Sequence, residues 1–513
     1  MKSTAMVGVM TLVSRILGFV RDMLIARYFG ADAATDAFFV AFRIPNFLRR
    51  LFAEGSFAQA FVPMLSEHKE KHDSAGMRRF LDRASGSLAL IVLLASLAGM
   101  LAAPALILVF APGFWVQDAQ FELSSAMLRI TFPYLFFVTL TAFAGGILNA
   151  HGRFAIPAFT PALLNISMIG AALWLAPRLP QPVTALAWGV LLAGFAQLAL
   201  QIPALAAAGL LPRPRIGFDD PEVRLLLKRM APAIFGVSVT QVNLLVDTLM
   251  ASFLVTGSVS WLYYSDRLVE FPLGVFGVAM GTAILPHLSK SHARKDAAGF
   301  SHALDWGLRW VLLIGLPATV GLAGLAEPLM STLFQYDEFG SRDVEMGGRS
   351  LMTYSLGLVG FIAVKVLASG FSARHDLATP VRHGVYAMIA NAVLGAALVY
   401  PLSRIGWGHA ALALSTALAA LFNAGLLLVR LIQAGVLRPE PGWWAYLTRL
   451  LLGNGLMGFV LIHFTRDLPW SSWSSHERIA ALLLWIATGG AAYFAALWLS
   501  GLRPAQLALR EGV

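Results

Sequence analysis

The 513-residue sequence contains no cysteine and few charged residues. The absence of cysteine excludes a disulfide framework, a thiolate nucleophile, and cysteine-ligated zinc or iron–sulfur sites. Charged residues make up 13% of the chain, against about a quarter in soluble globular proteins. Because 58% of the residues are hydrophobic, the composition argues against a soluble enzyme and favours a protein that crosses a bilayer many times.

The sequence also lacks the usual catalytic motifs. The 11 histidines are scattered, and we find no HExxH motif, no phosphate-binding glycine loop and no paired carboxylates in a polar loop. We therefore expect a protein that is not an enzyme, with no cofactor and no firm metal site.

Apolar segments recur along the whole chain, each long enough for the roughly 20 residues that a membrane-spanning helix needs. They predict an all-α, polytopic membrane protein of about fourteen transmembrane helices. Arg15 and Arg21 interrupt the first segment and no cleavage site follows it, so we interpret it as a retained helix. The predicted segments are 1–30, 35–66, 84–110, 122–149, 156–176, 184–209, 230–256, 259–288, 302–333, 349–371, 380–400, 408–433, 444–465 and 478–501.

Basic residues alternate along the loops between these segments. One set of alternate loops carries twenty-one Lys and Arg, whereas the other set carries six. This asymmetry fits the positive-inside rule and predicts that both termini are cytoplasmic. It also accounts for most of the net charge of +10, so we expect no nucleic-acid partner.

Two short sequence matches at one offset indicate an internal repeat. PMLS at 63–66 returns as PHLS at 286–289, and NAHGRFAIP at 149–157 aligns with SARHDLATP at 372–380. Both pairs lie 223 positions apart, which spans six predicted helices. We therefore predict a parallel pseudo-repeat of two six-helix lobes, at 1–210 and 211–436, and an appendage of two helices at 437–513.

Several charged residues fall inside the first two predicted helices. A central arginine costs roughly 2.5 to 3.5 kcal/mol to insert, so an excess of arginine indicates a wet, cationic cavity. The arginine fork suits phosphate oxygens, and we predict an anionic phosphate or pyrophosphate substrate. These residues are Arg15, Arg21, Asp22, Asp36, Arg43, Arg49, Arg50 and Glu54.

The same residues could instead form structural ion pairs. Arg15 could pair with Asp22, and Arg50 could pair with Glu54 at i, i+4. In the eighth predicted helix, Arg267 has acidic neighbours within its own helix. Both interpretations remain open at this stage.

Asp247 is an isolated acid deep in the seventh predicted helix. Asn243 and Thr248 lie on the same segment and could complete an oxygen-lined site for a cation or proton. The alternative is a hydrogen-bonded structural acid.

Long stretches of the chain resemble the MurJ (MviN) family, the lipid II flippases of bacterial peptidoglycan synthesis. The resemblance rests on residues 14–63, which include SRILGFVRDMLIARYFGADAATD and FRIPNFLRR, and it continues through 147–170, 257–291, FQYDEF at 334–339 and RHDLATPV at 374–381. It covers nearly the whole chain. It implies the multidrug/oligosaccharidyl-lipid/polysaccharide exporter superfamily, with two six-helix lobes around a central cationic cavity.

The resemblance also implies site residues and a groove for the polyprenyl tail, formed by the last two helices. The substrate-binding residues would be Ser14, Arg15, Arg21, Asn46, Arg49, Arg50 and Arg267, and the cavity ion pairs would involve Asp22, Asp36 and Glu54. Some family members have acids on both helix seven and helix eleven for sodium coupling. Here Asp247 and Asn243 have only Asn391 as a helix-eleven companion, so membrane potential, with or without a monovalent cation, is the expected driving force.

The expected function is therefore alternating-access transfer of lipid II from the cytoplasmic to the periplasmic leaflet of the bacterial inner membrane. We expect a monomer whose partners are lipid II, membrane lipids and, transiently, cell-wall synthesis proteins. Three alternatives stay open: a flippase of another polyprenyl-pyrophosphate glycan, a cation or drug antiporter of the same superfamily, and a non-transporting cell-wall scaffold.

Overall fold

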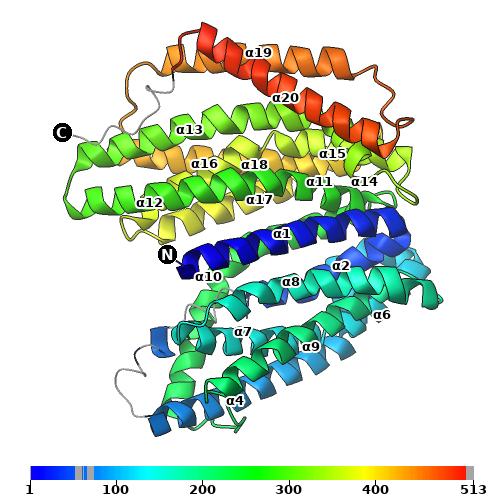
Figure 1. The fold of residues 1–513 in the computed structure, drawn as a ribbon, viewed down its shortest axis with the longest axis vertical. Coiled ribbons are helices and arrows are strands. Elements are labelled where there is room, and N and C mark those ends of the chain that lie inside the picture. The colour runs from blue at the N-terminus through cyan, green and yellow to red at the C-terminus, as the bar shows by residue number, and fades with distance from the viewer. Residues whose placement is uncertain (1, 52–60, 62, 66, 68–73, 504–513) are drawn as a thin grey trace. The chain divides into compact units, whose positions relative to one another are not determined.

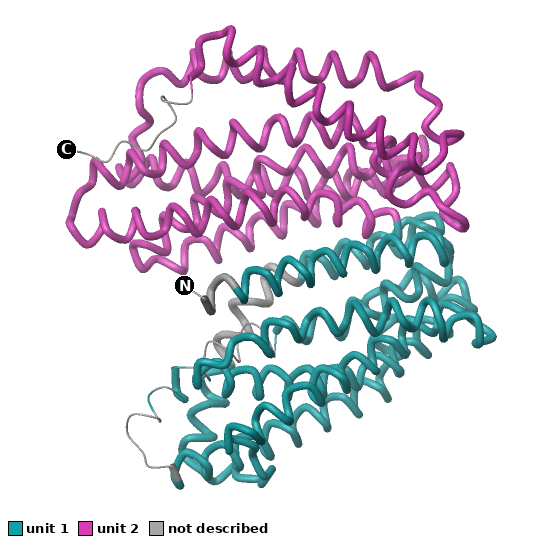
Figure 2. The backbone as a smooth tube through the Cα atoms, viewed as in Figure 1, with its two compact units in different colours: residues 1–260 teal, residues 261–513 magenta. Residues whose placement is uncertain are grey.

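A computed structural model describes residues 2–51, 61, 63–65, 67 and 74–503, without the side chains of 2–5, 74 and 231–241. In this part of the chain the regular structure is helical, with no strand (Figure 1). The chain divides into two compact units, residues 1–260 and 261–513 (Figure 2). This division does not test the lobe limits at 210 and 436, which stay a prediction.

The first unit is built from long helices that pack on one another in pairs. α8 packs against α1 and α9, α7 packs against α9, and α2 packs against α6. The elements of this unit are α1 (Lys2–Phe29), α2 (Ala33–Arg49), α4 (Ser74–Leu101), α5 (Ala103–Phe110), η2 (Pro112–Val116), α6 (Asp118–Thr131), α7 (Tyr134–Ala150), α8 (Ala155–Gly170), η3 (Ala171–Leu175), η4 (Ala176–Arg178), α9 (Thr184–Ala207) and α10 (Pro221–Ala251).

The second unit begins within α11 and ends with a helical hairpin. α18 packs against α15, α16 and α17, and α13 connects this bundle to α19, which pairs with α20. Its elements are α11 (Ser258–Pro272), η5 (Leu273–Gly277), α12 (Val278–Ala293), α13 (Ala297–Gly324), α14 (Ala326–Phe334), α15 (Ser341–Ser355), α16 (Leu358–Ser372), α17 (Ala378–Ser403), α18 (Gly408–Gln433), α19 (Trp443–Thr465) and α20 (Ser475–Leu499).

Helix boundaries in the two units repeat at the predicted offset of 223. α5 and α14 begin at Ala103 and Ala326, α6 and α15 begin at Asp118 and Ser341, and α8 and α17 begin at Ala155 and Ala378. Since each pair of starting residues is 223 apart, the two halves share one order of helices. The internal repeat extends well beyond the two short sequence matches that indicated it.

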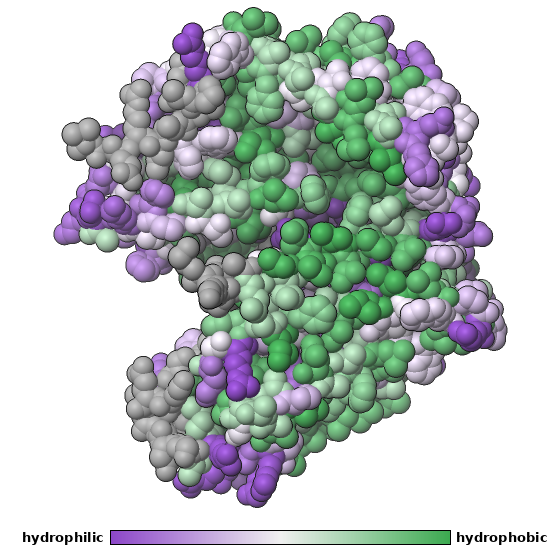
Figure 3. Space-filling view, in the orientation of Figure 1, coloured by the Kyte–Doolittle hydropathy of each residue, from purple (hydrophilic) through white to green (hydrophobic). Residues whose placement is uncertain are grey.

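The chain is a multi-pass membrane protein. Eleven segments of the described chain are long and apolar enough to cross a membrane. The predicted count of fourteen would be reached if α1, α2 and α10 also cross, and it stays a prediction. Large apolar side chains such as Leu192, Phe195 and Trp498 are more than half exposed, as expected where lipid is the solvent. In each unit, apolar residues cover the sides of the helices and hydrophilic residues gather at their ends (Figure 3).

The segment between α9 and α10 is fastened to α4, which explains why α10 belongs to the first compact unit. The Asp82 carboxylate accepts a hydrogen bond from the Arg213 amide at 2.7 Å, and Arg83 pairs with Asp220 at 2.7 Å. Partial burial raises the pKa of Asp220. Hydrogen bonds from Arg83 and from backbone amides lower it by a larger amount, so the pKa lies below the ordinary value of 3.8.

Candidate functional site

α1 buries an ion pair within the first unit. The Arg21 guanidinium donates to Asp22 Oδ1 at 2.9 and 2.6 Å and to Asn165 Oδ1 on α8 at 3.0 Å. Arg21 is 4% exposed and Asp22 is fully buried. Arg21, predicted to bind substrate, therefore pairs with Asp22, predicted to belong to a cavity ion pair. Through Asn165, Arg21 also joins α1 to α8.

The other polar residues of α1 lie closer to the surface of the unit. Arg15 is exposed and Ser14 is partly buried. The Ser14 carbonyl accepts a hydrogen bond from Asn165 Nδ2 at 2.9 Å. Asn165 thus contacts both Ser14 and Arg21, so a single α8 amide positions this face of α1.

α2 carries the second group of predicted site residues. It begins at an Asp32 cap, whose carboxylate accepts from the Thr35 amide at 2.8 Å, and it contains Pro45. One turn later, Arg49 Nε donates to Asn46 Oδ1 at 2.9 Å. Arg50 follows at the helix end, whereas Glu54 lies outside the described residues. Asn46 and Arg49, both predicted to bind substrate, therefore contact each other on α2.

Asp36 has hydrogen-bond donors as partners in place of a base. Its buried carboxylate accepts from the Gly257 amide at 2.7 Å, and from the Ser260 amide and hydroxyl at 2.8 and 2.6 Å. These donors lie at the start of α11. The predicted cavity ion pair is not among these contacts, and the backbone amides at this helix start stabilise the carboxylate instead.

Arg43 was noted as a charge in the second predicted helix but was not selected as a site residue. In the structure its guanidinium donates to the hydroxyl of Thr248 on α10. The signal available in the sequence was the position of Arg43, one residue before the Ile44-Pro45 step and within two turns of Arg49 and Arg50.

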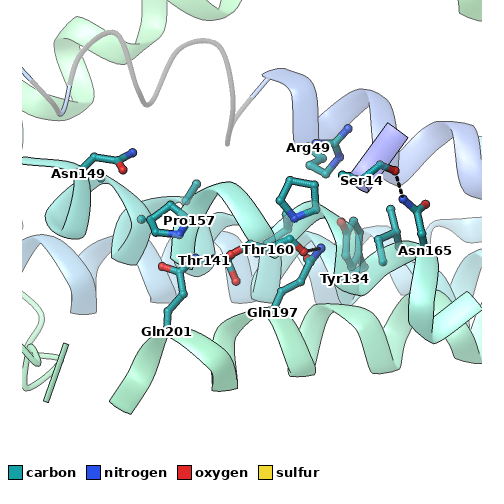
Figure 4. Close-up of a pocket in the computed structure, with 16 residues that line it drawn as sticks. Ser14, Arg49, Tyr134, Thr141, Asn149, Pro157, Thr160, Asn165, Gln197 and Gln201 are labelled. Carbon is teal, nitrogen blue, oxygen red and sulfur yellow. Dashed lines mark hydrogen bonds between the residues drawn. The ribbon is translucent and has the colours of Figure 1, made fainter. Parts of the chain in front are cut away.

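A polar pocket opens inside the first unit, between α1, α2, α7, α8 and α9 (Figure 4). Its volume is about 440 Å³. None of its 16 lining residues is acidic, and Arg49 is the single full charge among them. The lining residues are Ser14, Arg49, Tyr134, Val138, Thr141, Ala142, Gly145, Gly146, Asn149, Pro157, Thr160, Pro161, Leu164, Asn165, Gln197 and Gln201.

Ser14 and Arg49 are predicted site residues that the pocket brings together, whereas its glutamines were missed. Gln197 and Gln201 lie four positions apart on the otherwise apolar α9, so they share a helix face. Two side-chain amides on one face of an otherwise apolar membrane helix are the sequence signal that could have indicated these glutamines.

Arg267 lies in the second unit and also has local partners. It pairs with Glu270 at 2.6 Å, and its guanidinium lies 5.3 Å from the ring centre of Tyr263. The intrahelical pair left open by the sequence is therefore formed, but about a third of the Arg267 side chain remains exposed and could meet a ligand.

The predicted coupling residues are distributed over both units. Asp247 and Asn243 lie on α10 of the first unit. Asn391 lies on α17 of the second, where its side-chain oxygen accepts from the Thr416 hydroxyl at 3.2 Å. A search of the described residues finds no group of three His, Asp or Glu side chains suited to a metal ion.

A helical membrane protein that buries arginine and encloses a pocket lined by polar side chains within a bundle has the architecture of a membrane transporter. Comparison with solved structures finds proteins of the same fold. A multidrug resistance MATE family transporter of the MOP superfamily, in an inward-facing conformation, matches with a TM-score of 0.66 over 82% of this chain and 95% of that chain. At 14% sequence identity, this match shows a likeness of fold and nothing more.

Closer relatives identify the family. The family model for lipid II flippase MurJ matches residues 25–482. A probable lipid II flippase MurJ of Vibrio cholerae is 46% identical over 98% of this chain and 96% of its own length. A lipid II flippase MurJ of Burkholderia cenocepacia is 41% identical over 98% of this chain and 97% of its own. A solved lipid II flippase MurJ in an inward closed conformation matches with a TM-score of 0.78 at 25% identity, over 96% of this chain and 98% of that chain. The chain belongs to the lipid II flippase MurJ family.

Proposed function

We propose that this protein flips lipid II from the cytoplasmic to the periplasmic leaflet of a bacterial inner membrane by alternating access. In a member of this family, the observation that carries the proposal furthest is the pocket whose described lining includes Arg49 and no acidic residue. A cation substrate would require acidic groups there, whereas the pyrophosphate of lipid II requires fixed positive charge. The pocket chemistry therefore favours a lipid-linked anion over a cationic drug.

The pyrophosphate is bound by the accessible arginines. Arg15 is exposed, Arg49 lines the pocket and Arg267 is partly exposed, and these positions suit contact with an anionic headgroup. Ser14, Asn46 and Arg50 assist from adjacent positions. Arg21 acts mainly by holding α1 against α8 through Asp22 and Asn165.

Membrane potential drives the cycle, since a charge moved through the field gains about 2.3 kcal/mol per 100 mV. A monovalent cation near Asp247 and Asn243 of the first unit adjusts this coupling. Both termini face the cytoplasm, and the protein acts as a monomer in contact with membrane lipids and, transiently, with cell-wall synthesis proteins. The α19–α20 hairpin supplies the groove for the polyprenyl tail.

The test is a lipid II flipping assay with the full chain in proteoliposomes. Arg15→Ala, Arg49→Ala and Arg267→Ala should each reduce flipping at least about tenfold, as expected when one charge-assisted contact of about 1.5 to 3 kcal/mol is lost. Lys365→Ala is the matched control, because it removes an exposed membrane cation outside the pocket. Normal export by all three arginine variants would reject pyrophosphate binding by this set.

The coupling role needs its own comparison. Asp247→Asn should alter how flipping depends on cation gradients or pH while leaving lipid II affinity nearly unchanged. If gradient dependence is identical in both proteins, Asp247 is a buried structural acid.

A further inference from the structure

The pocket of the first unit has a second wall whose chemistry differs from that of Arg49. Gln197 and Gln201 extend from α9 on the side opposite Arg49 (Figure 4). Gln197 is 3% exposed and Gln201 is 1% exposed. A glutamine pair this deeply buried is costly unless its polar atoms are satisfied.

Only half of each glutamine amide is satisfied within the described residues. Gln197 Nε2 donates to the Thr160 carbonyl at 3.2 Å, and Gln201 Nε2 donates to the Thr160 hydroxyl at 3.2 Å. The Oε1 atoms of both glutamines and the Thr141 hydroxyl have no hydrogen-bond partner in this part of the structure. The pocket wall therefore contains two carbonyl oxygens and a hydroxyl group that are buried and lack a hydrogen-bond partner among the described residues.

The missing partner must bring hydrogen-bond donors without positive charge. None of the described residues that line the pocket is acidic, and Arg49 in the facing wall opposes a cation. An anion would meet two carbonyl oxygens at this wall, which repel it. A neutral group rich in O–H and N–H donors satisfies the acceptors at no electrostatic cost.

We infer that this glutamine wall binds the saccharide of a lipid-linked headgroup, beside the site where Arg49 binds the anion. This inference rests on the proposed function and names the part of the substrate that the pocket receives. Saccharide hydroxyl and acetamido groups supply the required donors, whereas a stem peptide brings charged ends that this wall cannot pair. The cavity of about 440 Å³ lies within the roughly 300 to 1,000 Å³ typical of ligand pockets.

Variants can change this wall and leave Arg49 in place. The double variant Gln197→Leu, Gln201→Leu removes the acceptors together with their burial cost. Gly145→Ala is a second, independent variant, because a Cβ there would lie 3.5 Å from Pro157 Cβ and 3.6 Å from Gln201 Oε1. These are ordinary contacts, so the methyl group fills the pocket without displacing the backbone. Gly425→Ala is the control, since it adds the same methyl group on α18 with nothing within 4 Å.

The assay measures binding of three lipids to the full chain in nanodiscs. Undecaprenyl pyrophosphate carries the anion and tail, undecaprenyl-pyrophosphoryl disaccharide adds the saccharide, and lipid II adds the peptide. The unmodified protein should bind the disaccharide lipid at least about tenfold more tightly than undecaprenyl pyrophosphate, as two or more satisfied hydrogen bonds imply. In the glutamine double variant this preference should fall below about threefold, with undecaprenyl pyrophosphate binding changed less than about twofold. Gly145→Ala should reduce the preference in the same direction, and Gly425→Ala should keep it.

Three results would overturn the inference. If both pocket variants keep the full preference, the glutamines contact water only. If they weaken all three lipids equally, the wall is structural, and if the preference appears only when the peptide is added, the pocket receives peptide. In each of these cases flipping of lipid II by the unmodified protein would leave the proposed function intact. Failure of the unmodified protein to bind or flip lipid II would reject both.

Discussion

The buried Arg21–Asp22 pair allows a sharp separation between structural and substrate-binding arginines. At 2.6 Å, two unit charges attract with about 6 kcal/mol at an effective dielectric constant of about 20, most of which offsets the cost of burying them. Removing Arg21 alone breaks this buried ion pair and leaves the Asp22 carboxylate in place, and breaking a buried pair in this way typically costs about 3 to 5 kcal/mol. Arg21→Ala should therefore destabilise the first unit.

The expected effect is large enough for a melting assay. A unit of this size loses roughly 2 to 4 °C of melting temperature per kcal/mol, so Arg21→Ala should melt about 6 to 20 °C lower in detergent and accumulate poorly in the membrane. The double variant Arg21→Met, Asp22→Leu removes both charges and should recover most of the loss, because apolar replacements of buried pairs are often neutral. Arg15→Ala is the matched control on the same helix and should melt normally.

Flipping by the double variant then separates the two roles. Recovered stability together with recovered flipping would make Arg21 structural, whereas recovered stability without flipping would add a ligand contact. An Arg21→Ala protein that melts like the unmodified protein would refute the reasoning, since breaking the buried Arg21–Asp22 pair would then cost no stability.

Three other contacts give testable expectations. Asp36→Ala should lower the free energy of unfolding by at least about 2 kcal/mol, measured by denaturant titration, because it strands three buried donors of Gly257 and Ser260; an unchanged midpoint would contradict this. Arg478 donates to the carbonyls of Ser331, Gln335, Trp473 and Ser471, so Arg478→Met should speed amide exchange before α20 at least about tenfold, and exposed Arg466→Met should not. Because the pKa of Asp220 is lowered in the folded protein, its contribution to stability is complete above the ordinary pKa and is lost as the pH falls through the folded value. A spin label attached at Leu211→Cys, in the segment that Asp220 holds, should therefore become mobile only below about pH 4. In an Arg83→Met background the label should become mobile at a higher pH.

Helix positions were well predicted where apolar runs are bounded by polar loops. The segment predicted at 408–433 coincides with α18 (Gly408–Gln433), and the segment at 184–209 nearly matches α9 (Thr184–Ala207). Breaks inside apolar runs were missed. The predicted helix at 84–110 is divided between α4 and α5, and the helix at 302–333 between α13 and α14. Hydropathy is nearly constant across such breaks, so their positions depend on local residues such as Gly324 and on packing.

Site residues could be predicted by type but not by partner. Arg15 and Arg21 lie on one helix and look equivalent in the sequence, yet one is exposed and the other is buried against Asn165. The difference depends on α8, whose contacting residue is 144 positions away. Similarly, Asp36 was expected to meet a base, but the start of α11 supplies backbone amides instead.

The free-energy cost of placing a polar group in the membrane explains both why the arginines were predicted and why the pocket glutamines were missed. A charged group in a bilayer costs so much that its presence demands a reason, and Arg49 was therefore visible from the sequence alone. A neutral amide costs far less, so Gln197 and Gln201 do not stand out from an apolar helix. Their role emerges only when the structure shows that each amide donates to Thr160 while its oxygen, in the wall of a cavity, lacks a partner among the described residues. Charge thus reports where the anionic part of a substrate can bind, and unsatisfied neutral groups beside it report where the uncharged part can bind.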